Sequence, residues 1–541
     1  MAQTQAPPQV AAYGTWRSPI TAASVAAGKG ALGQVALDGA DVYWSESRPA
    51  EGGRNVIVRR TPDGASHDVT PAGFNVRTRV HEYGGGAFTV AQGTVYFANW
   101  ADQRVYRQEQ GAQPEPLTAT RNLFFADFAL DAHRQRLICV REDHRQAGQE
   151  AINTLVALDL RANRSGTMLV AGNDFYSSPR VSPDGTRLAW LTWHHPNMPW
   201  DGTELWVGTF RADGTIGKAQ RIAGDPGEAV AQPEWSPEGV LYFVSDRSGW
   251  WNLYRWQEGR AEPLHPLKAE FSQPQWALGM SSYAFLASHR ILCAYTQEGT
   301  WHLGVLDTVK QGDQTAKQGD QTAKQGDQTA KQGDHKSTPL QTQRDVGKHT
   351  FTPVKTPYSY IAQVRAGQGR AVFIGAAPAQ PPEVAQLDPA TMRMTPLSKT
   401  DEQLPDAGYI SIPQAIEYPT ERGLTAHAWF YPPQNKDYAA PKGAQPPLLV
   451  MSHGGPTSAA PNVFDPRKQF WTSRGIAVLD VNYGGSTGYG TEYRRRLNGQ
   501  WGVVDVDDCI NGARYLAQRG LVDGDRLLIT GGSAGGYTTL C

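Results

Sequence analysis

The chain has 541 residues, which is too long for one ordinary hydrophobic core and suggests roughly three to four units, or fewer if one is a large all-β domain. Lys and Arg number 51 and Asp and Glu 52, so the net charge of −1 leaves no basic excess to bind phosphates or an anionic membrane. Glycine (57) and proline (37) are frequent and only 19% of residues are charged, which favours short strands and tight turns over a coiled coil or a nucleic-acid scaffold.

The beginning of the chain, Met1–Val10, carries neither a positively charged segment nor an apolar one, so a secretory signal is not expected. No apolar run reaches the roughly 18 residues that a membrane-spanning helix needs. The cysteines form no CxxC pair, which argues against a disulfide framework and a zinc cluster; they are Cys139, Cys293, Cys509 and Cys541. We therefore expect reduced thiols, no cofactor and a cytoplasmic protein, and the sequence leaves the oligomeric state open.

A weak repeat recurs through the first part of the chain. Similar heptapeptides, with starts 53, 54 and 41 residues apart, begin at Phe125, Ser178, Gln232 and Gln273. Strand-like runs follow them, for example at 187–193, 240–244 and 283–287. A period of roughly 40 to 50 residues with several short strands per unit is typical of propeller blades, which bury their apolar faces only against one another.

Further strand pairs bring the total to about seven blades over residues 30–405; these pairs lie near 34–60, 87–117 and 361–387. A pair of β-sandwiches, or a set of unrelated strands, is the alternative. Between the sixth and seventh blades we expect a flexible, solvated insertion at 310–345, where Lys-Gln-Gly-Asp-Gln-Thr-Ala occurs three times in succession. Alanine is its only apolar residue and glycine recurs every seventh position, so the period does not indicate a coiled coil.

The pattern changes near residue 406. Runs that predict a hairpin are followed by apolar strands, a helix and a last strand, at 410–417, 424–431, 447–451, 476–481, 506–519 and 526–530. Apolar strands alternating with helices imply a mostly parallel sheet covered on both faces. We therefore expect an N-terminal segment, 1–29, that packs on the C-terminal domain, a β-propeller at 30–405 and an α/β domain at 406–541.

The strand at 526–530 runs directly into Gly531-Gly-Ser-Ala-Gly535, a G-x-S-x-G motif followed by helix-forming residues. In this context the glycines leave room for a sharp turn that lifts the serine hydroxyl clear of the sheet. An ordinary glycine turn is the alternative. We predict that Ser533 is a catalytic nucleophile and that the backbone N–H of Ala534, the next residue, is one donor of an oxyanion hole.

A second loop lies where an acyl-transfer site needs its other oxyanion donor. The strand at 447–451 leads into Ser452-His-Gly-Gly-Pro456, a tight loop with exposed backbone N–H groups. His453 could be read as the general base. A base is expected on a segment that follows the serine, so we assign His453 a role in shaping the loop.

Four motifs together resemble the prolyl oligopeptidase family of serine peptidases, in its branch of acylaminoacyl-peptidases and dipeptidyl-peptidases. They are Gly531-Gly-Ser-Ala-Gly-Gly-Tyr537, His453-Gly-Gly-Pro456, Asn482-Tyr-Gly-Gly-Ser-Thr-Gly-Tyr-Gly490 and Trp501-Gly-Val-Val-Asp-Val-Asp-Asp508. The similarity is dense over 408–541 and looser over the propeller-like half. It implies an α/β-hydrolase domain in which Ser533 is the nucleophile and the amides of Gly455 and Ala534 form the oxyanion hole, under a propeller that restricts entry to short peptides.

The chain departs from the α/β-hydrolase pattern after Ser533. Such enzymes supply their triad in the order Ser, Asp, His, but the eight residues that follow Ser533 contain neither Asp nor His. We therefore expect an incomplete α/β-hydrolase domain with an exposed strand edge. We also expect a chain inactive alone, because loss of triad members removes roughly four to six orders of magnitude in rate. The sequence leaves open a separately encoded C-terminal piece as a partner.

The function that these features predict is serine-type hydrolysis of short peptides, in the manner of an acylaminoacyl- or dipeptidyl-peptidase, through an acyl-enzyme on Ser533. An esterase would use the same groups, and only the propeller and the family resemblance favour a peptidase. A non-catalytic propeller that binds ligands and carries a vestigial hydrolase portion is the third interpretation.

Overall fold

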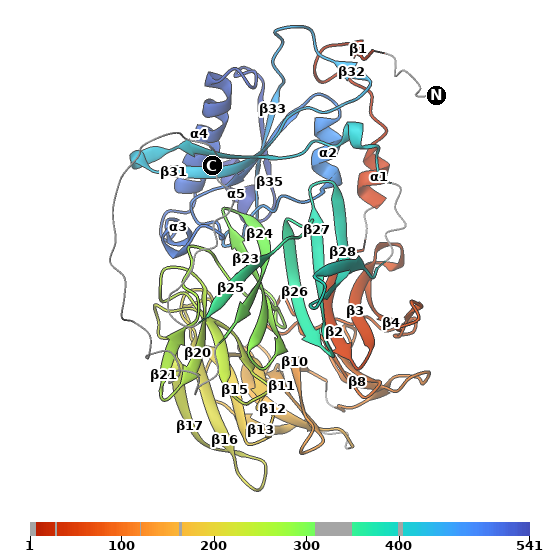
Figure 1. Ribbon diagram of the computed structural model, residues 1–541, viewed down its shortest axis with the longest axis vertical. Coiled ribbons are helices and arrows are strands. Elements are labelled where there is room, and N and C mark those ends of the chain that lie inside the picture. Colours follow the sequence, from red (N-terminus) through yellow and green to blue (C-terminus); the bar gives the residue numbers. More distant parts are fainter. Residues whose placement is uncertain (1–6, 28–29, 120, 162–164, 309–348, 399–403) are drawn as a thin grey trace, which may run out of the picture.

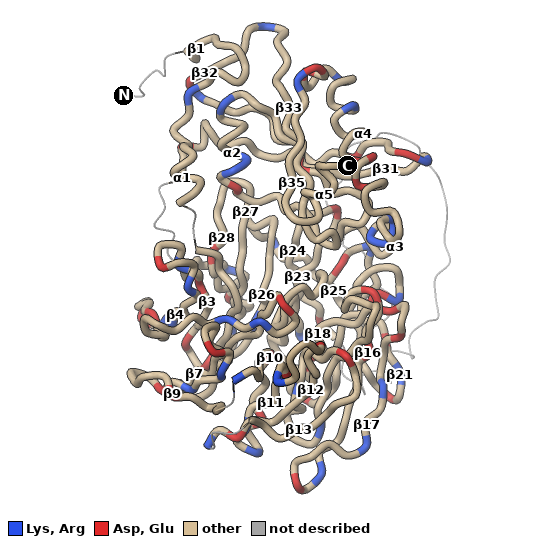
Figure 2. The backbone as a smooth tube through the Cα atoms, turned by 180° about the vertical axis from the view of Figure 1, so that it is seen from behind, with Lys and Arg blue, Asp and Glu red and all other residues tan. Residues whose placement is uncertain are grey.

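The computed structural model describes residues 7–27, 30–119, 121–161, 165–308, 349–398 and 404–541. They form two units stacked along the long axis of the molecule, a β-rich N-terminal unit and an α/β C-terminal unit (Figure 1). Basic and acidic residues are interspersed over both units (Figure 2), in keeping with the net charge of −1. None of the helices in the described ranges is long and apolar enough to cross a membrane.

Within the described residues the N-terminal unit contains seven four-stranded antiparallel sheets, each built from strands that are consecutive in the chain, which confirms the predicted seven-bladed β-propeller. Blades 1 to 3 consist of β2 (Leu32–Asp38), β3 (Asp41–Arg48), β4 (Arg54–Arg60) and β5 (Ser66–Asp68); β6 (Phe88–Ala91), β7 (Thr94–Ala98), β8 (Val105–Gln108) and β9 (Glu115–Pro116); and β10 (Leu123–Asp131), β11 (Arg136–Asp143), β12 (Ile152–Asp159) and β13 (Thr167–Val170). Blades 4 and 5 consist of β14 (Phe175–Val181), β15 (Arg187–Trp193), β16 (Glu204–Phe210) and β17 (Ile216–Ala223); and β18 (Val230–Trp235), β19 (Leu241–Ser245), β20 (Asn252–Gln257) and β21 (Arg260–Pro263). Blades 6 and 7 consist of β22 (Tyr283–Ala287), β23 (Arg290–Gln297), β24 (Thr300–Asp307) and β25 (Thr350–Val354); and β26 (Tyr360–Gly367), β27 (Arg370–Ala377), β28 (Gln380–Asp388) and β29 (Arg393–Pro396).

Blades 1 and 7 meet by packing. Val35 and Trp44 of blade 1 lie in one buried apolar cluster with Val372 and Val384 of blade 7. The Arg370 guanidinium adds a hydrogen bond across the same seam, to the backbone carbonyl of Gly39 at 3.0 Å. The ring is thus closed by side-chain burial, the dominant favourable term in folding.

In three of its four copies, the heptapeptide repeat corresponds to a β-bulge in the first strand of a blade. Asp127, Ser178 and Gln232 lie at the bulges of β10, β14 and β18, and each has a positive φ, between 43° and 58°. A bulge of this kind bends the strand and increases its twist. The fourth heptapeptide, at 273–279, lies in the loop before β22 and not in a strand.

The repeat insertion at 310–345 falls outside the described residues. Its flanks are β24 and β25, which pair with each other in the sixth sheet. The insertion therefore lies within blade 6, and the predicted position between blades 6 and 7 was wrong. The sequence concealed β25 because this outermost strand is largely exposed and contains Pro353, a composition typical of an edge strand.

The C-terminal unit is built on a five-stranded sheet with helices on both sides (Figure 1). Its strands are β30 (Gln414–Pro419), β31 (Thr425–Tyr431), β33 (Leu448–Ser452), β34 (Ala477–Asn482) and β35 (Leu527–Gly531). Its helices are α2 (Pro466–Thr472), α3 (Thr491–Arg495), α4 (Val504–Gln518) and α5 (Ala534–Leu540). The α/β class predicted for this region is confirmed.

The strand order of this sheet is β30-β31-β34-β33-β35. The β34–β33 and β33–β35 pairs are parallel and the other two are antiparallel, so the sheet is half parallel where we expected a mostly parallel one. The reason is that the β30–β31 hairpin docks antiparallel against β34. Alternate residues of β31 face opposite sides: Ala428 and Phe430 pack with the α4 residues, and Trp429 and Tyr431 pack on the other side.

The N-terminal residues lie against the C-terminal unit. The short strand β1 (Gln9–Val10) pairs in parallel with β32 (Tyr438–Ala439), and the Trp16 ring stacks on Tyr438 with centroids 6.5 Å apart. Helix α1 (Ala22–Ala27) follows and contacts α2. The described residues 7–27 therefore lie against the C-terminal unit, and the chain then enters the propeller.

Candidate active site

Ser533 lies on a sharp turn between β35 and α5. Its backbone angles, φ 53° and ψ −122°, are strained for a residue with a side chain, and the side chain is exposed to solvent. A Cβ at Gly531 would lie 2.2 Å from the Gly535 carbonyl oxygen, and one at Gly535 would lie 2.1 Å from the Ser452 carbonyl oxygen. Both positions therefore require glycine, and the strand–turn–helix context predicted for the motif is present.

The loop after β33 lies beside this turn. Ser452, the last residue of β33, is paired with Gly531, and its hydroxyl donates to the Gly535 carbonyl at 2.9 Å. A Cβ built at Gly454 would lie 3.3 Å from the Ser533 Cβ. The segment His453–Ser458, which we name the oxyanion loop, is thus held against the serine.

The two amides assigned to the oxyanion hole remain available. Gly455 has a φ of 129°, a conformation that favours glycine, and the Gly455–Pro456 peptide bond is cis. Ala534 is the buried first residue of α5. Among the residues that the structure describes, no hydrogen bond uses the N–H of Gly455 or of Ala534. An unsatisfied N–H at such a position can donate a hydrogen bond to a developing oxyanion.

His453 holds the oxyanion loop and does not bond to Ser533. With Nδ1 protonated, the ring donates to the Gly454 carbonyl at 2.8 Å, and Nε2 accepts from the Ser486 hydroxyl at 2.7 Å. The ring also stacks on Tyr483 with centroids 4.3 Å apart. Burial lowers the pKa of His453 and keeps the imidazole neutral.

The carboxylates of α4 have structural partners. Asp505 accepts from the Gly502 amide at 2.7 Å and from the Thr538 hydroxyl, which ties α5 to α4. Asp508 accepts from the Gly484 amide at 2.7 Å. In the described part of the chain, no hydrogen bond joins the Ser533 hydroxyl to a histidine or a carboxylate, and no group of three or more His, Cys, Asp or Glu side chains could hold a metal ion.

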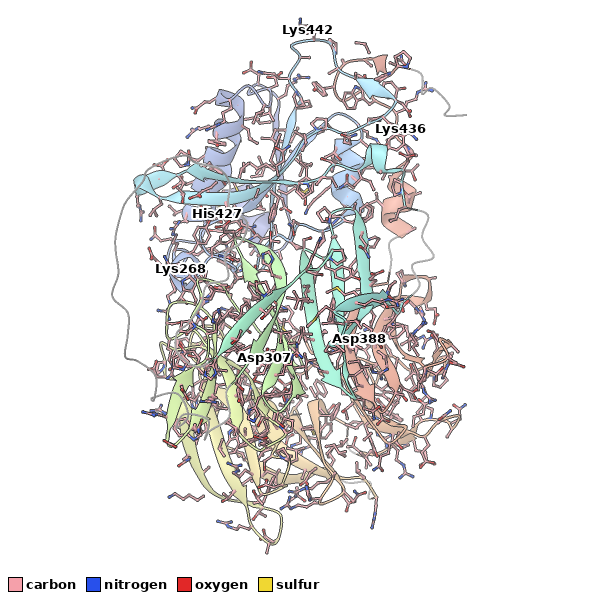
Figure 3. The ribbon with its side chains drawn as sticks, in the orientation of Figure 1. Lys268, Asp307, Asp388, His427, Lys436 and Lys442 are labelled. Atoms are coloured by element: carbon pink, nitrogen blue, oxygen red, sulfur yellow. The ribbon has the colours of Figure 1, made fainter. Side chains whose placement is uncertain are left out.

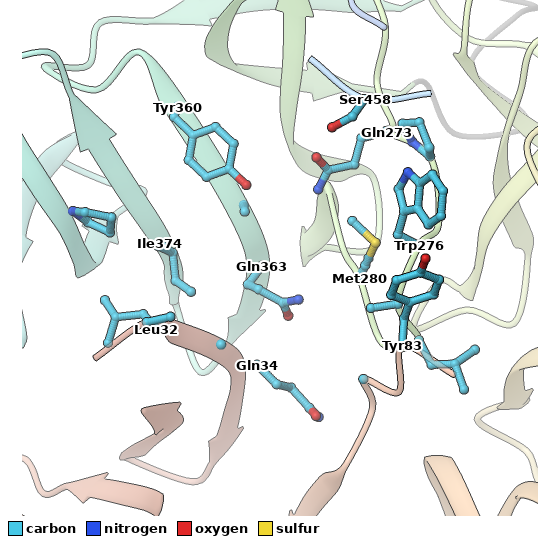
Figure 4. Close-up of a pocket in the computed structure, with 18 of the residues that line it drawn as sticks. Leu32, Gln34, Tyr83, Gln273, Trp276, Met280, Tyr360, Gln363, Ile374 and Ser458 are labelled. Atoms are coloured by element: carbon cyan, nitrogen blue, oxygen red, sulfur yellow. The ribbon is translucent and has the colours of Figure 1, made fainter. Parts of the chain in front are cut away.

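A cavity of about 660 Å³ lies between the two units. Tyr83, Trp276 and Met280 lie on one side of it, and Tyr360 and Gln363 lie on the other (Figure 4). Ser458 and Pro461 of the C-terminal unit complete its wall. Arg77 is the one charged residue among the described residues that line it, so the cavity suits an uncharged, partly aromatic ligand.

A second cavity, of about 900 Å³, opens beside the serine turn. His453, Gly454 and Gly532 line it on the side of the turn. Its floor includes the buried ion pair between the Lys468 ammonium and the Asp480 carboxylate, 2.5 Å apart.

The sequence did not reveal the residues that line the cavity between the units. They come from β2, from the segment before β6, from the loop before β22 and from β26, and no local pattern joins these segments. The motif at 482–490 also contributes to the interface. Its Tyr489 stacks on His427 of β31 (Figure 3), with centroids 4.2 Å apart, and lies against Gly299 in blade 6.

Two solved structures of known proteins have a similar architecture. A solved puromycin-hydrolyzing peptidase of Mycobacterium tuberculosis superposes with a TM-score of 0.86 at 37% sequence identity, covering 98% of this chain and 78% of that one. A Pyrococcus horikoshii acylaminoacyl peptidase superposes with a TM-score of 0.64 at 13% identity, over 94% of this chain and 74% of that one, which shows a shared fold.

The sequence similarity to curated proteins is confined to shorter stretches. Dipeptidyl aminopeptidase BIII of Pseudoxanthomonas mexicana is 38% identical over 94 residues, which make up 17% of this chain and only 14% of that protein. The family model described as the prolyl oligopeptidase family matches residues 462–541, which include the serine turn. From this match and from the mycobacterial structure, which is similar over nearly the whole chain, we conclude that the chain belongs to the prolyl oligopeptidase family.

Proposed function

We propose that this chain carries the nucleophile and the oxyanion hole of a serine peptidase that cleaves short peptides or aminoacyl amides. The observation that carries the proposal is the exposed Ser533 on a strained turn, next to a loop in which the Gly455 N–H makes no hydrogen bond to any residue that the structure describes. The names of the similar proteins, which include peptidases that act on dipeptidyl, acylaminoacyl and puromycin substrates, support the substrate class.

In the proposed reaction the Ser533 Oγ attacks the substrate carbonyl carbon and gives its proton to a general base. The carbonyl oxygen becomes an oxyanion bound by the N–H groups of Gly455 and Ala534, and each such donor is worth roughly 3 to 4 kcal/mol in the transition state. The C–N bond then breaks and the leaving amine takes the proton, which leaves an acyl-enzyme on Ser533. Water activated by the same base releases the acid and restores the serine.

We propose that the triad Asp and His come from outside residues 1–541 and pack near β35. Among the described residues, strand β35 is paired on one side only and its apolar side chains are exposed, with Leu528 50% and Ile529 42% accessible. An unpaired edge with exposed apolar residues is a surface that a further strand or helix would cover. A separately encoded C-terminal piece, or continuation of the same chain, would supply it.

The wall of the cavity between the units carries a single charged side chain among its described residues, that of Arg77, which supports substrates without charged side chains. We therefore propose aminoacyl amides with an aromatic side chain, of which puromycin is one, as the first substrates to test. An esterase remains the second candidate, because the acyl-enzyme chemistry at Ser533 does not distinguish an ester from an amide. Paired assays with an aromatic aminoacyl ester and the matching amide separate the two.

The proposal is tested by reaction with a fluorophosphonate probe. We expect the full chain to be labelled at Ser533, more slowly than a complete serine peptidase, and the Ser533→Ala variant to remain unlabelled. Labelling elsewhere, or none at all after addition of a C-terminal piece that carries Asp and His, would overturn the proposal in favour of a non-catalytic binding propeller.

We make two further proposals, on the domain limits and on the location of the protein. We propose the domain limits 1–29, 30–405 and 406–541, which the contacts of β1 and Trp16 with the C-terminal unit support. We also propose a cytoplasmic location, supported by the buried, unpaired thiols of Cys139, Cys293 and Cys509, which suit a reducing compartment.

A further inference from the structure

The segment that joins blades 5 and 6 contacts the oxyanion loop directly. The Trp276 indole Nε1–H, in the loop before β22, donates to the Thr457 carbonyl at 2.7 Å, across 181 positions of sequence. Thr457 is two residues beyond Gly455. A shift of the Thr457 carbonyl therefore changes the direction of the Gly455 amide, because only Pro456 lies between them.

Contacts within the propeller fix the position of the Trp276 ring. Tyr83 packs edge-on against Trp276 with centroids 5.1 Å apart, as Figure 4 shows, and Trp200 packs on it at 4.4 Å. The backbone beside Trp276 is also held, since the Leu278 amide donates to the Gly84 carbonyl at 2.8 Å. The indole is thus a preorganised donor in the sense that its position does not depend on the loop it bonds.

A second contact reaches the same loop through Glu270. The Glu270 carboxylate is fully buried in the propeller and accepts from the amides of Gly488 and Gly490, at 2.7 and 3.2 Å. The segment that carries these amides also holds the oxyanion loop. The Ser486 hydroxyl bonds to His453, and the Thr487 amide donates to the Ser458 carbonyl at 2.8 Å.

The Glu270 carboxylate belongs to a cluster of buried charged side chains that restricts its position. The Arg494 guanidinium of α3 lies 2.6 Å from the Asp246 carboxylate and 4.0 Å from that of Glu270, and it stacks over Trp251 at 4.4 Å. All three charged side chains are buried. A buried charge that loses its partners is strongly unfavourable, so this cluster tolerates little displacement of blades 5 and 6 relative to the C-terminal unit.

We propose that the propeller segment Glu270–Trp276 positions the oxyanion loop, so that the Gly455 amide points at the reacting carbonyl only while blade 6 is docked. This inference rests on the proposed function, which gives the Gly455 amide its role. Glu270 and Trp276 are positioning residues in this scheme: Trp276, which also lines the cavity between the units, bonds to the oxyanion loop, and Glu270 acts through the segment 486–490 that holds this loop. The propeller then acts on the chemistry itself and does more than restrict entry.

The test compares two Trp→Phe variants that each lose one indole donor. Trp276→Phe removes the bond to Thr457 and keeps an aromatic ring. Trp235→Phe is the matched control, because the Trp235 indole donates to the Arg180 carbonyl at 2.9 Å inside the propeller. In the full chain, we expect amide hydrogen exchange over residues 450–461 to become at least about threefold faster in Trp276→Phe and to stay unchanged in Trp235→Phe. Equal exchange in Trp276→Phe and the unaltered chain overturns the proposal.

A second readout separates positioning from general stability. We expect the second-order rate of fluorophosphonate labelling at Ser533 to fall about tenfold in Trp276→Phe, a part of the loss that follows removal of a whole oxyanion donor, and to change less than about twofold in Trp235→Phe, whereas the free energy of unfolding falls by a similar amount in both variants. Glu270→Gln, which keeps the shape of the side chain, should shift labelling in the same direction. Equal losses in Trp276→Phe and Trp235→Phe would overturn the proposal. An unaltered chain that is never labelled, even after addition of a C-terminal piece that carries Asp and His, refutes the proposed function, and the exchange comparison still decides whether blade 6 positions the loop.

Discussion

Strand β27 in blade 7 and strand β35 in the C-terminal unit are both apolar in sequence, yet they have opposite environments. Val372 and Phe373 of β27 are fully buried, whereas Leu528 and Ile529 of β35 are 50% and 42% exposed. The difference comes from their neighbours. Strand β27 lies between β26 and β28 and is covered by the adjacent blades, whereas β35 has β33 on one side and no strand on the other in the described chain.

This comparison shows that an apolar run predicts a strand but not its burial. In a propeller each blade is covered by the next, so every strand of the ring obtains its cover from the same repeat. In an open sheet the cover of an edge strand must come from elsewhere. An apolar run of the same kind therefore contributes several kcal/mol to the free energy of unfolding in the propeller and little at the edge of the C-terminal sheet.

The largest effect should separate the two strands directly. We expect Phe373→Ala to lower the free energy of unfolding of the propeller by about 3 to 5 kcal/mol, because it empties a fully buried position. Ile529→Ala should cost less than about 1 kcal/mol, since much of that side chain is already in water. Urea unfolding of both variants measures the difference, and equal costs would show that β35 is covered in solution.

A second prediction uses a partly buried histidine of the propeller. His81 packs edge-on against Phe175 and Trp193, and burial lowers its pKa to about 4. Above pH 6.5 the folded and unfolded states are both neutral at this residue. As the pH falls from 6.5 towards 4, the unfolded chain takes up a proton that the folded chain does not, so stability falls by up to about 3 kcal/mol.

The variant His81→Phe should remove this acid-dependent loss. The measurement is the free energy of unfolding at pH 7 and at pH 4.5, in urea. His67→Phe, at an exposed position of β5, is the matched control and should keep the full dependence on pH. A loss of the same size in His81→Phe and in the unaltered chain would contradict the prediction.

Local patterns sufficed for much of the fold. The runs 187–193 and 283–287 coincide with β15 and β22, and the glycines of the serine motif, which the close contacts of Gly531 and Gly535 require, marked the turn. These features depend on residues that are neighbours in sequence, so periodicity and turn chemistry reveal them.

Features that depend on distant neighbours were not predictable. The bond from Trp276 to Thr457 and the contact of Glu270 with Gly488 join segments some 180 to 220 positions apart, and each segment alone looks like an ordinary loop. Strand β25 was hidden for a related reason, because its partner β24 lies on the far side of the insertion. The sequence therefore located the turn that carries Ser533 and left out what the propeller contributes to it.

The smallest expected effect on stability sharpens the comparison at the edge itself. Leu528→Lys places a charge on the exposed edge strand, which should discourage pairing between chains through β35 while changing the free energy of unfolding by no more than about 0.5 kcal/mol. Sedimentation velocity over a range of concentrations should show less self-association in this variant. Leu424→Lys, at an exposed apolar position in the turn between β30 and β31, is the control and should leave association unchanged. If Leu424→Lys reduced association and Leu528→Lys did not, the adhesive surface would lie on the β30–β31 hairpin, and the exposed apolar side chains of β35 would have to be covered within the chain when it is in solution.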